Sequence, residues 1–251
     1  MLTHPLVELL ASLRLSGMKQ AFVEQLTQEV GDLSFEERFS LLLEREKVYR
    51  DNKRLLSSLR QAQLRHTACV EDIDYQQTRG LQKSMMMSLY DCQWVKQQRQ
   101  ILITGPTGTG KSYIACALAH KACLEGYKAK YLRFSRFFQE MLIAKADGSY
   151  TKWLQRLTKI NVLILDDWGL VTMDDIRRRD LLEVLDERYM RSSTIVTSQL
   201  PVNSWHESIG DPTLADAILD RIVHNAYQIT LSGESMRKLK SEIKKEDNKS
   251  T

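Results

Sequence analysis

The chain has 251 residues, of which 43% are hydrophobic, and its formal net charge is +4. This length suits one large or two modest domains, and no apolar run is long enough to span a membrane. The N-terminus lacks the features of a signal peptide and the four cysteines form no C-x-x-C pair, so we expect a cytoplasmic protein with reduced thiols and no membrane partner.

Residues 1–65 are expected to form a small helical domain that contacts DNA or a partner protein. Apolar residues recur at helical spacing from Leu6 to Leu13, and Ser34 with Glu37 forms a capping box that opens a long helix. Composition alone favours a solvated face for the basic half of this helix over a contact with DNA phosphates. The stretch 45–65 contains two acidic residues, Glu46 and Asp51, and seven basic ones: Arg45, Lys47, Arg50, Lys53, Arg54, Arg60 and Arg65.

We expect residues 66–99 to form an irregular connector. Two parts of it, residues 71–75 and Arg79-Gly80, would approach a nucleotide base. From residue 100 to 240, short apolar runs alternate with helical patterns, which is typical of an α/β fold with a mainly parallel sheet and helices on both faces. Residues 241–251 are rich in charge and predict a flexible tail. We expect strands near 100–104, 129–133, 162–166, 194–198 and 226–231.

A glycine-rich segment directly follows the first of these strands and has the pattern G-x-x-x-x-G-K-[ST]. Such a loop points several backbone N–H groups at one phosphate, and the helix after it adds its dipole. Lys111 would add a charge at the β- and γ-phosphates, and the Ser112 hydroxyl would hold Mg²⁺. The apolar strand and Ala-rich helix on either side make a chance match the weaker interpretation. The residues expected to bind the nucleotide are Gly105, Pro106, Thr107, Gly108, Thr109, Gly110, Lys111, Ser112 and Tyr113.

Two carboxylates, Asp166 and Asp167, end the apolar strand that begins at Val162. Ligands bind at the carboxyl ends of strands in open α/β sheets. Asp166 would hold Mg²⁺, directly or through water. Asp167, one residue on, would point elsewhere and polarise an attacking water. The alternative is a carboxylate pair that caps a turn.

Three further polar residues are open to two interpretations each. Ser198 or a neighbouring residue, at the end of the strand 194–198, hydrogen-bonds the attacking water or the γ-phosphate, or else this is an ordinary polar strand end. Arg221 and Arg237 either stabilise the charge that develops in phosphoryl transfer or form surface ion pairs. The sequence by itself favours the ion pairs.

The order of these segments resembles the IstB transposition helpers, which are grouped with the DnaC-like helicase loaders among the AAA+ ATPases. The resemblance spans nearly the whole chain. The phosphate loop and the Asp166-Asp167 strand fix only the superfamily, and the later segments point to the IstB branch. The matching segments are 105–112, Ile164–Gly169, Arg188-Tyr189, Ser193–Gln199, Gly210–Pro212, Leu219–Arg221 and Gly233–Ser235, with Ser34–Arg38 and Arg79–Leu81 before them.

The resemblance implies an AAA+ core with a five-stranded parallel sheet, preceded by a small helical domain. It makes Ser198 the sensor-1 candidate, Arg221 the arginine finger for the ATP of a neighbouring subunit, and Arg237 the sensor-2 candidate. With Lys111 and Asp167, these are the implied catalytic residues. Asp167 stands where many AAA+ proteins carry Glu, and its shorter side chain fits the slow hydrolysis of a switch.

The resemblance also implies ATP-dependent assembly into a ring or helix on duplex DNA, without sequence preference. The assembly would recruit and stimulate a DDE transposase and help choose the target site, and hydrolysis would drive disassembly. It favours phosphate contact by the basic stretch 130–160, in which Asp147-Gly148-Ser149 would be a turn between two helices. The DNA-contact candidates are Arg133, Arg136, Lys145, Lys152, Arg50, Lys53 and Arg54.

Two other functions stay open at this point. A DnaC-like replicative helicase loader that binds single-stranded DNA would have the same core, because the N-terminal helices decide the partner. A P-loop ATPase without a nucleic-acid role is compatible with the modest net charge.

Overall fold

The computed structural model describes residues 5–27, 33–75, 79–236 and 238. The chain divides into two compact units, Met1–Ser57 and Ser58–Thr251, and each is described by itself. The expected tail at 241–251 and the sensor-2 candidate Arg237 lie outside the described residues. Across the described ranges, no helix combines the length and apolarity needed to cross a membrane.

The first unit contains α1 (Pro5–Ser12), α2 (Ser16–Thr27) and the first part of α3 (Phe35–Ala62). The predicted capping box is confirmed at the start of α3. The Ser34 N–H donates to Glu37 Oε2 (2.8 Å), and the Glu37 N–H donates to Ser34 Oγ (3.3 Å). Two N–H groups that a helix start leaves unpaired are thereby satisfied, which fixes where α3 begins.

Glu46 of α3 caps the N-terminus of α2. Its carboxylate is 6% exposed and accepts hydrogen bonds from the N–H groups of Gly17 (2.7 Å) and Met18 (3.1 Å). The two helices approach so closely that a Cβ at Gly17 would lie 2.7 Å from the carbonyl oxygen of Arg45. A charge at a helix N-terminus therefore supplements a small apolar core. That core comprises Met18, Ala21 and Leu42.

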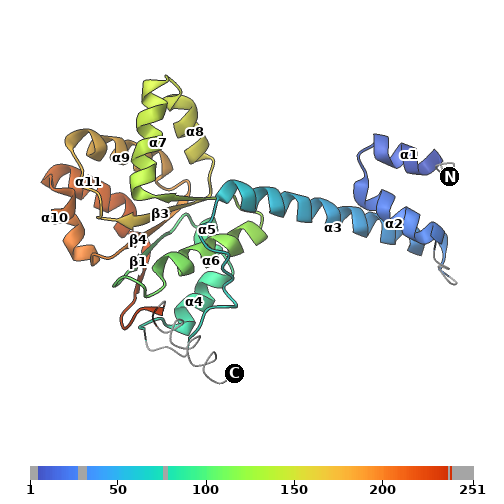
Figure 1. The fold of residues 1–251 in the computed structure, drawn as a ribbon, viewed down its shortest axis with the longest axis horizontal. Helices are drawn as coiled ribbons and strands as arrows, with labels where there is room; N and C mark the ends of the chain where they lie inside the picture. The colour runs from blue at the N-terminus through green and yellow to red at the C-terminus, as the bar shows by residue number, and fades with distance from the viewer. Residues whose placement is uncertain (1–4, 28–32, 76–78, 237, 239–251) are drawn as a thin grey trace. The chain divides into compact units, whose positions relative to one another are not determined.

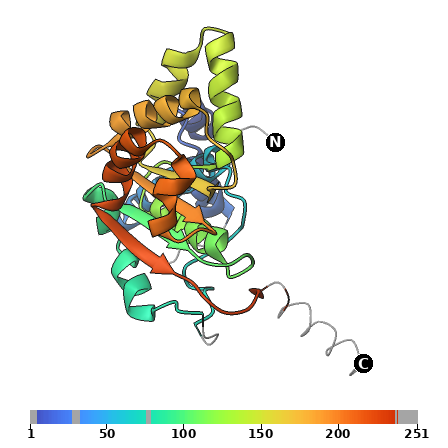
Figure 2. The same cartoon turned by 90° about the vertical axis from the view of Figure 1, so that its left-hand side faces the viewer.

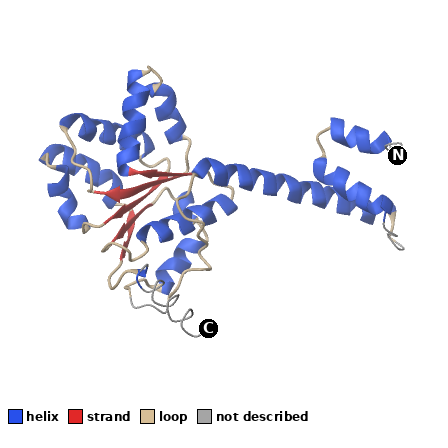
Figure 3. Ribbon diagram, viewed as in Figure 1, coloured by secondary structure: helices blue, strands red, loops and turns tan. Residues whose placement is uncertain are grey.

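The second unit is built on a five-stranded parallel sheet with the strand order β2-β3-β4-β1-β5 (Figures 1 and 3). The α/β prediction is confirmed, and each strand overlaps its predicted position. The strands are β1 (Gln100–Thr104), β2 (Ala129–Arg133), β3 (Val162–Trp168), β4 (Ser193–Ser198) and β5 (Ala226–Thr230).

Helices cover both faces of this sheet, as Figures 1 and 2 show from two directions. On one face, α6 packs on β1 to β4 and α4 packs on α6; on the other, α7 packs on β2 and β3, and α11 on β1. The helices are α4 (Lys83–Tyr90), α5 (Gln93–Lys96), α6 (Lys111–Leu124), α7 (Phe134–Ala146), α8 (Tyr150–Thr158), α9 (Asp175–Arg188), the 3₁₀ helix η1 (Val202–Ser204), α10 (Trp205–Ile209) and α11 (Pro212–Val223).

The main core lies between the sheet and helices α7 to α11. Leu102, Leu163 and Val196 of the central strands are inaccessible to solvent there. The Trp168 ring lies 4.7 Å from the Phe134 ring and is stacked on Trp205. Strands buried on both faces read as continuous apolar runs, which is why the sequence located them. This rigid layer aligns the carboxyl ends of the strands at one edge.

The basic stretch between β2 and β3 forms the two-helix element that the sequence predicts. The expected turn between α7 and α8 is confirmed: Gly148 has φ 73°, and Asp147 Oδ1 accepts a hydrogen bond from the Ser149 N–H (2.9 Å). The helices pack through Phe137 and Trp153, whose rings lie 5.7 Å apart.

Candidate nucleotide-binding site

The glycine-rich loop joins β1 to the N-terminus of α6. Gly110 has φ 97°, a backbone conformation that favours glycine, and a Cβ there would lie 2.7 Å from Nη1 of Arg79 and displace this guanidinium. Lys111 Nζ donates to the carbonyl oxygens of Gly105 (2.7 Å) and Pro106 (2.8 Å). The ammonium and the first N–H groups of α6 thus meet at one place, which is an arrangement that binds anions.

Asp166 is fully buried at the end of β3 and is surrounded by donors. Its Oδ1 accepts hydrogen bonds from Ser112 Oγ (2.7 Å) and Thr197 Oγ1, and its Oδ2 accepts from Tyr131 OH (2.5 Å) and Arg65 Nη1 (3.3 Å). Burial works to raise the pKa of Asp166, but the three hydroxyl donors and the Arg65 charge together lower it. The carboxylate is therefore ionised at neutral pH.

Asp167 approaches the same guanidinium as Asp166, which corrects the expectation that it points elsewhere. Its Oδ2 lies 4.0 Å from Arg65 Nη1. The pairing of β3 with β4 is irregular between Leu165 and Trp168, and Asp167 has φ 67°. A bulge of this kind breaks the strict alternation of side chains along a strand. Both carboxylates consequently face one site.

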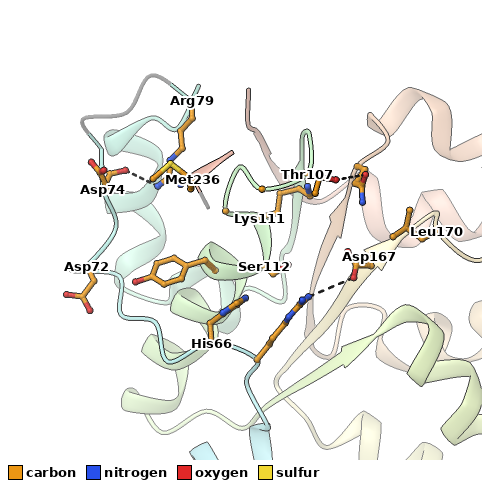
Figure 4. Close-up of a pocket in the computed structure, with 15 residues that line it drawn as sticks. His66, Asp72, Asp74, Arg79, Thr107, Lys111, Ser112, Asp167, Leu170 and Met236 are labelled. Atoms are coloured by element: carbon orange, nitrogen blue, oxygen red, sulfur yellow. Dashed lines mark hydrogen bonds and ion pairs between the residues drawn. The ribbon is translucent and has the colours of Figure 1, made fainter. Parts of the chain in front are cut away.

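The phosphate loop and Asp167 open onto a pocket of about 500 Å³ (Figure 4), whereas the buried Asp166 does not line it. The predicted nucleotide-binding residues Gly105, Pro106 and Thr109 do not line it: Thr109 is fully buried, and its hydroxyl donates to the Pro106 carbonyl (2.9 Å). The pocket is lined by Thr107, Gly108, Gly110, Lys111, Ser112 and Tyr113 from the loop and α6, by Arg65, His66, Asp72, Asp74 and Arg79 from the segment before β1, and by Asp167, Leu170, Gln199 and Met236.

Ser198 does not lie in this pocket, so the structure does not support its sensor-1 assignment. Its side chain is fully buried, and its Oγ donates to the Trp168 carbonyl (2.9 Å) and accepts from the Leu200 N–H (3.0 Å). The hydroxyl is used to hold the end of β4. The next residue, Gln199, lines the pocket instead, and its Oε1 accepts a hydrogen bond from Thr107 of the loop (2.8 Å).

The family model described as IstB-like ATP binding protein matches residues 8–244. The chain belongs to this family. A Sinorhizobium fredii protein named as an insertion sequence ATP-binding protein is 48% identical over 239 residues, which cover 95% of this chain and 98% of that protein. An insertion sequence IS21 ATP-binding protein of Pseudomonas aeruginosa is 30% identical over 236 residues, covering 93% and 89%.

Solved structures match about two thirds to three quarters of this chain in fold. The DnaC helicase loader has a TM-score of 0.54 at 16% identity, covering 65% of this chain and 96% of that chain. AMPPCP-bound DnaA from Aquifex aeolicus has a TM-score of 0.56 at 18% identity, covering 74% and 57%. Likeness at this level of identity shows an AAA+ P-loop fold and nothing finer.

Arg221 of the IstB-like protein is not among the residues that line the pocket. It lies on α11, where its Nε donates to Asp186 (2.7 Å) and its Nη1 to Asp220 (3.2 Å). Its side chain is 31% exposed. The guanidinium is thus held at the surface, away from the phosphate loop of its own chain.

The DNA-contact candidates divide by their surroundings. On the α7–α8 hairpin, Lys145 pairs with Asp180 and Arg136 with Glu140, whereas Arg133 and Lys152 are exposed. In the first unit, Arg50 pairs with Glu46, Arg54 lies 3.8 Å from Asp51, and Lys53 is exposed.

Sequence reasoning missed several residues of the site. Arg65 was assigned to a run of seven basic residues on a helix. Tyr131 was not distinguished from the other residues of its predicted strand. Arg79 was expected near a base; it is 5% exposed and donates to the Thr109 carbonyl (3.1 Å), so it braces the loop. No local pattern distinguishes such residues, because long-range contacts alone place them.

Proposed function

We propose that this protein is an ATPase that assembles on duplex DNA in an ATP-dependent manner and recruits a transposase to it. The observation that supports this most is that the phosphate loop and Asp167 line one pocket, while the buried Asp166 is hydrogen-bonded to Ser112 of the same lining. The family, whose relatives are named as insertion sequence ATP-binding proteins, supplies the transposition context. Hydrolysis releases the assembly.

Within this proposal the residues have distinct roles. Lys111 and the N–H groups at the start of α6 bind the β- and γ-phosphates. Ser112 and Asp166 hold Mg²⁺, and they fit it because two hard oxygen donors lie 2.7 Å apart. Bound Mg²⁺ supplies positive charge to the phosphate oxygens. Asp167 orients the attacking water. Gln199, rather than Ser198, hydrogen-bonds this water or the γ-phosphate.

Arg221 completes the site from another copy of the chain. Its position outside the pocket of its own chain supports this role, and its exposure makes it available to a neighbour. A guanidinium supplied by a second subunit stabilises charge on the transferred phosphoryl group and couples hydrolysis to assembly. Such head-to-tail contacts build a ring or a helix.

The decisive experiment uses Lys111→Ala in the full chain. Loss of a charge-assisted contact should reduce ATP affinity by about tenfold or more and abolish ATP-dependent assembly on duplex DNA, measured by sedimentation. Lys96→Ala, an exposed lysine of the same unit that does not line the pocket, is the matched control. If Lys111→Ala still assembles on DNA only when ATP is present, the phosphate assignment is wrong.

A replicative helicase loader is the second candidate, favoured by the structural likeness to DnaC. The two functions differ in the nucleic acid that they hold. The transposition proposal expects tighter binding to duplex DNA than to a single strand of equal length. Titrations of both at one salt concentration decide between them, and a strong preference for single strands supports the loader.

A further inference from the structure

The short segment 63–65, which follows α3, brings Arg65 into contact with the carboxylates of Asp166 and Asp167. Within the second unit, α3 ends at Ala62 and Gln63 reverses the chain with φ 50°. Gln63 Oε1 accepts a hydrogen bond from Lys130 Nζ on β2 (2.6 Å). Two residues later, Arg65 lines the pocket. The exit of α3 is therefore fastened to the sheet edge beside the nucleotide site.

Arg65 contacts both carboxylates at once. Its Nη1 lies 3.3 Å from Oδ2 of Asp166 and 4.0 Å from Oδ2 of Asp167. Asp166 is fully buried, whereas the Arg65 side chain is 29% exposed. The Asp167 side chain is 34% exposed, so the guanidinium joins a buried carboxylate to a partly exposed one and itself lies partly in solvent.

Arg65 and a divalent cation would compete for the same carboxylate, that of Asp166. Both Oδ1 and Oδ2 of Asp166 already accept hydrogen bonds from protein donors, and Ser112, which would share the cation, donates to Oδ1. A divalent cation at Ser112 and Asp166 would repel a guanidinium that lies 3.3 Å from the same carboxylate. Among the donors to Asp166 that the described residues supply, Arg65 is the charged one, so it is the donor that a cation disfavours most.

We propose that Arg65 is a positioning residue that holds the Asp166–Asp167 pair in place and releases Asp166 when a divalent cation binds with nucleotide. Release makes the backbone of residues 63–66 more mobile. The mobility of the end of α3 therefore depends on whether nucleotide and cation are bound. The inference rests on the proposed function, because it requires nucleotide and cation to bind at this pocket.

The first test measures Mg²⁺ dependence with the full chain and a fluorescent, non-hydrolysable ATP analogue. Removing the competing charge in Arg65→Ala should lower the half-saturating Mg²⁺ concentration by about twofold to fivefold, the range expected for a partly exposed ion pair. The shift is measured relative to the analogue affinity of the same variant in EDTA, so that any effect of Arg65 on nucleotide binding without Mg²⁺ is separated from its effect on Mg²⁺. Arg60→Ala, an exposed arginine on the last turns of α3, is the matched control and should behave as wild type.

The second test follows amide hydrogen exchange in peptides that cover residues 58–66, first in wild type and then in two Arg65 variants. In wild type bound to the analogue, replacing EDTA by Mg²⁺ should speed exchange at 63–66. In Arg65→Ala, exchange should already be fast and should not respond to Mg²⁺. Arg65→Lys, which keeps the charge but not the planar fork, should lie between the two.

Each failure has a distinct meaning. If wild type binds no analogue even with Mg²⁺, the proposed function fails and this inference fails with it. If analogue binds but Mg²⁺ leaves exchange at 63–66 unchanged, only the role of Arg65 is wrong. If Arg65→Ala weakens analogue binding equally in EDTA and in Mg²⁺, Arg65 is a phosphate ligand and is not released.

Discussion

Asp167 adopts a backbone conformation that few residues tolerate. A φ of 67° in a residue with a side chain costs about 1 kcal/mol, and aspartate accepts it better than most. In return the carboxylate stands beside Asp166 rather than on the opposite face of the sheet. The strain is found where the proposed chemistry takes place, which is typical of functional sites.

Ser198 and Gln199 are neighbours with different roles, and substitution should separate them. Ser198→Ala removes a buried hydroxyl that bonds two backbone groups, so we expect the free energy of unfolding to fall by about 1–3 kcal/mol with little change in turnover per folded molecule. Gln199→Ala removes a polar group in the pocket and should lower ATP turnover by about 100-fold at unchanged stability. Urea unfolding and phosphate release measure the two effects. The reverse pattern would restore Ser198 as the sensor-1 residue.

At the scale of elements, the strands were predictable and the irregularities were not. The runs Ile101–Ile103 and Val162–Leu165 are apolar because both faces of the sheet are covered, and this signal is local. The bulge at Asp167 depends on how β3 pairs with β4, and the position of Arg65 depends on where α3 ends. Those contacts join residues far apart in the chain, so no window of sequence contains them.

The α7–α8 hairpin offers a prediction on DNA binding from two lysines in the same element. Lys152 is exposed, whereas the charge of Lys145 is already paired with Asp180. Lys152→Ala should therefore reduce the slope of log affinity against log salt by about one, and Lys145→Ala by less. Duplex titrations between low and moderate salt measure both slopes. Equal slopes for wild type and Lys152→Ala would remove this lysine from the DNA interface.

At the scale of the whole molecule, the proposed function assigns catalytic roles to two parts of the chain that do not meet. The phosphate loop and Asp167 open onto the pocket, while Arg221 is held on α11 by Asp186 and Asp220. A site divided in this way is complete only between two copies arranged head to tail. Turnover should then depend on which residues meet at each junction rather than on any single chain.

Mixing two inactive variants tests this arrangement. Lys111→Ala lacks the phosphate contact but keeps Arg221, and Arg221→Ala has the reverse defect. In an equal mixture, half of the phosphate sites are intact and half of those face a chain with Arg221, so about a quarter of wild-type turnover should return at random junctions. A mixture of Arg221→Ala with the double variant Lys111→Ala, Arg221→Ala is the control and should stay inactive. If the first mixture also stays inactive while both variants still assemble with wild type, Arg221 does not act across the subunit junction.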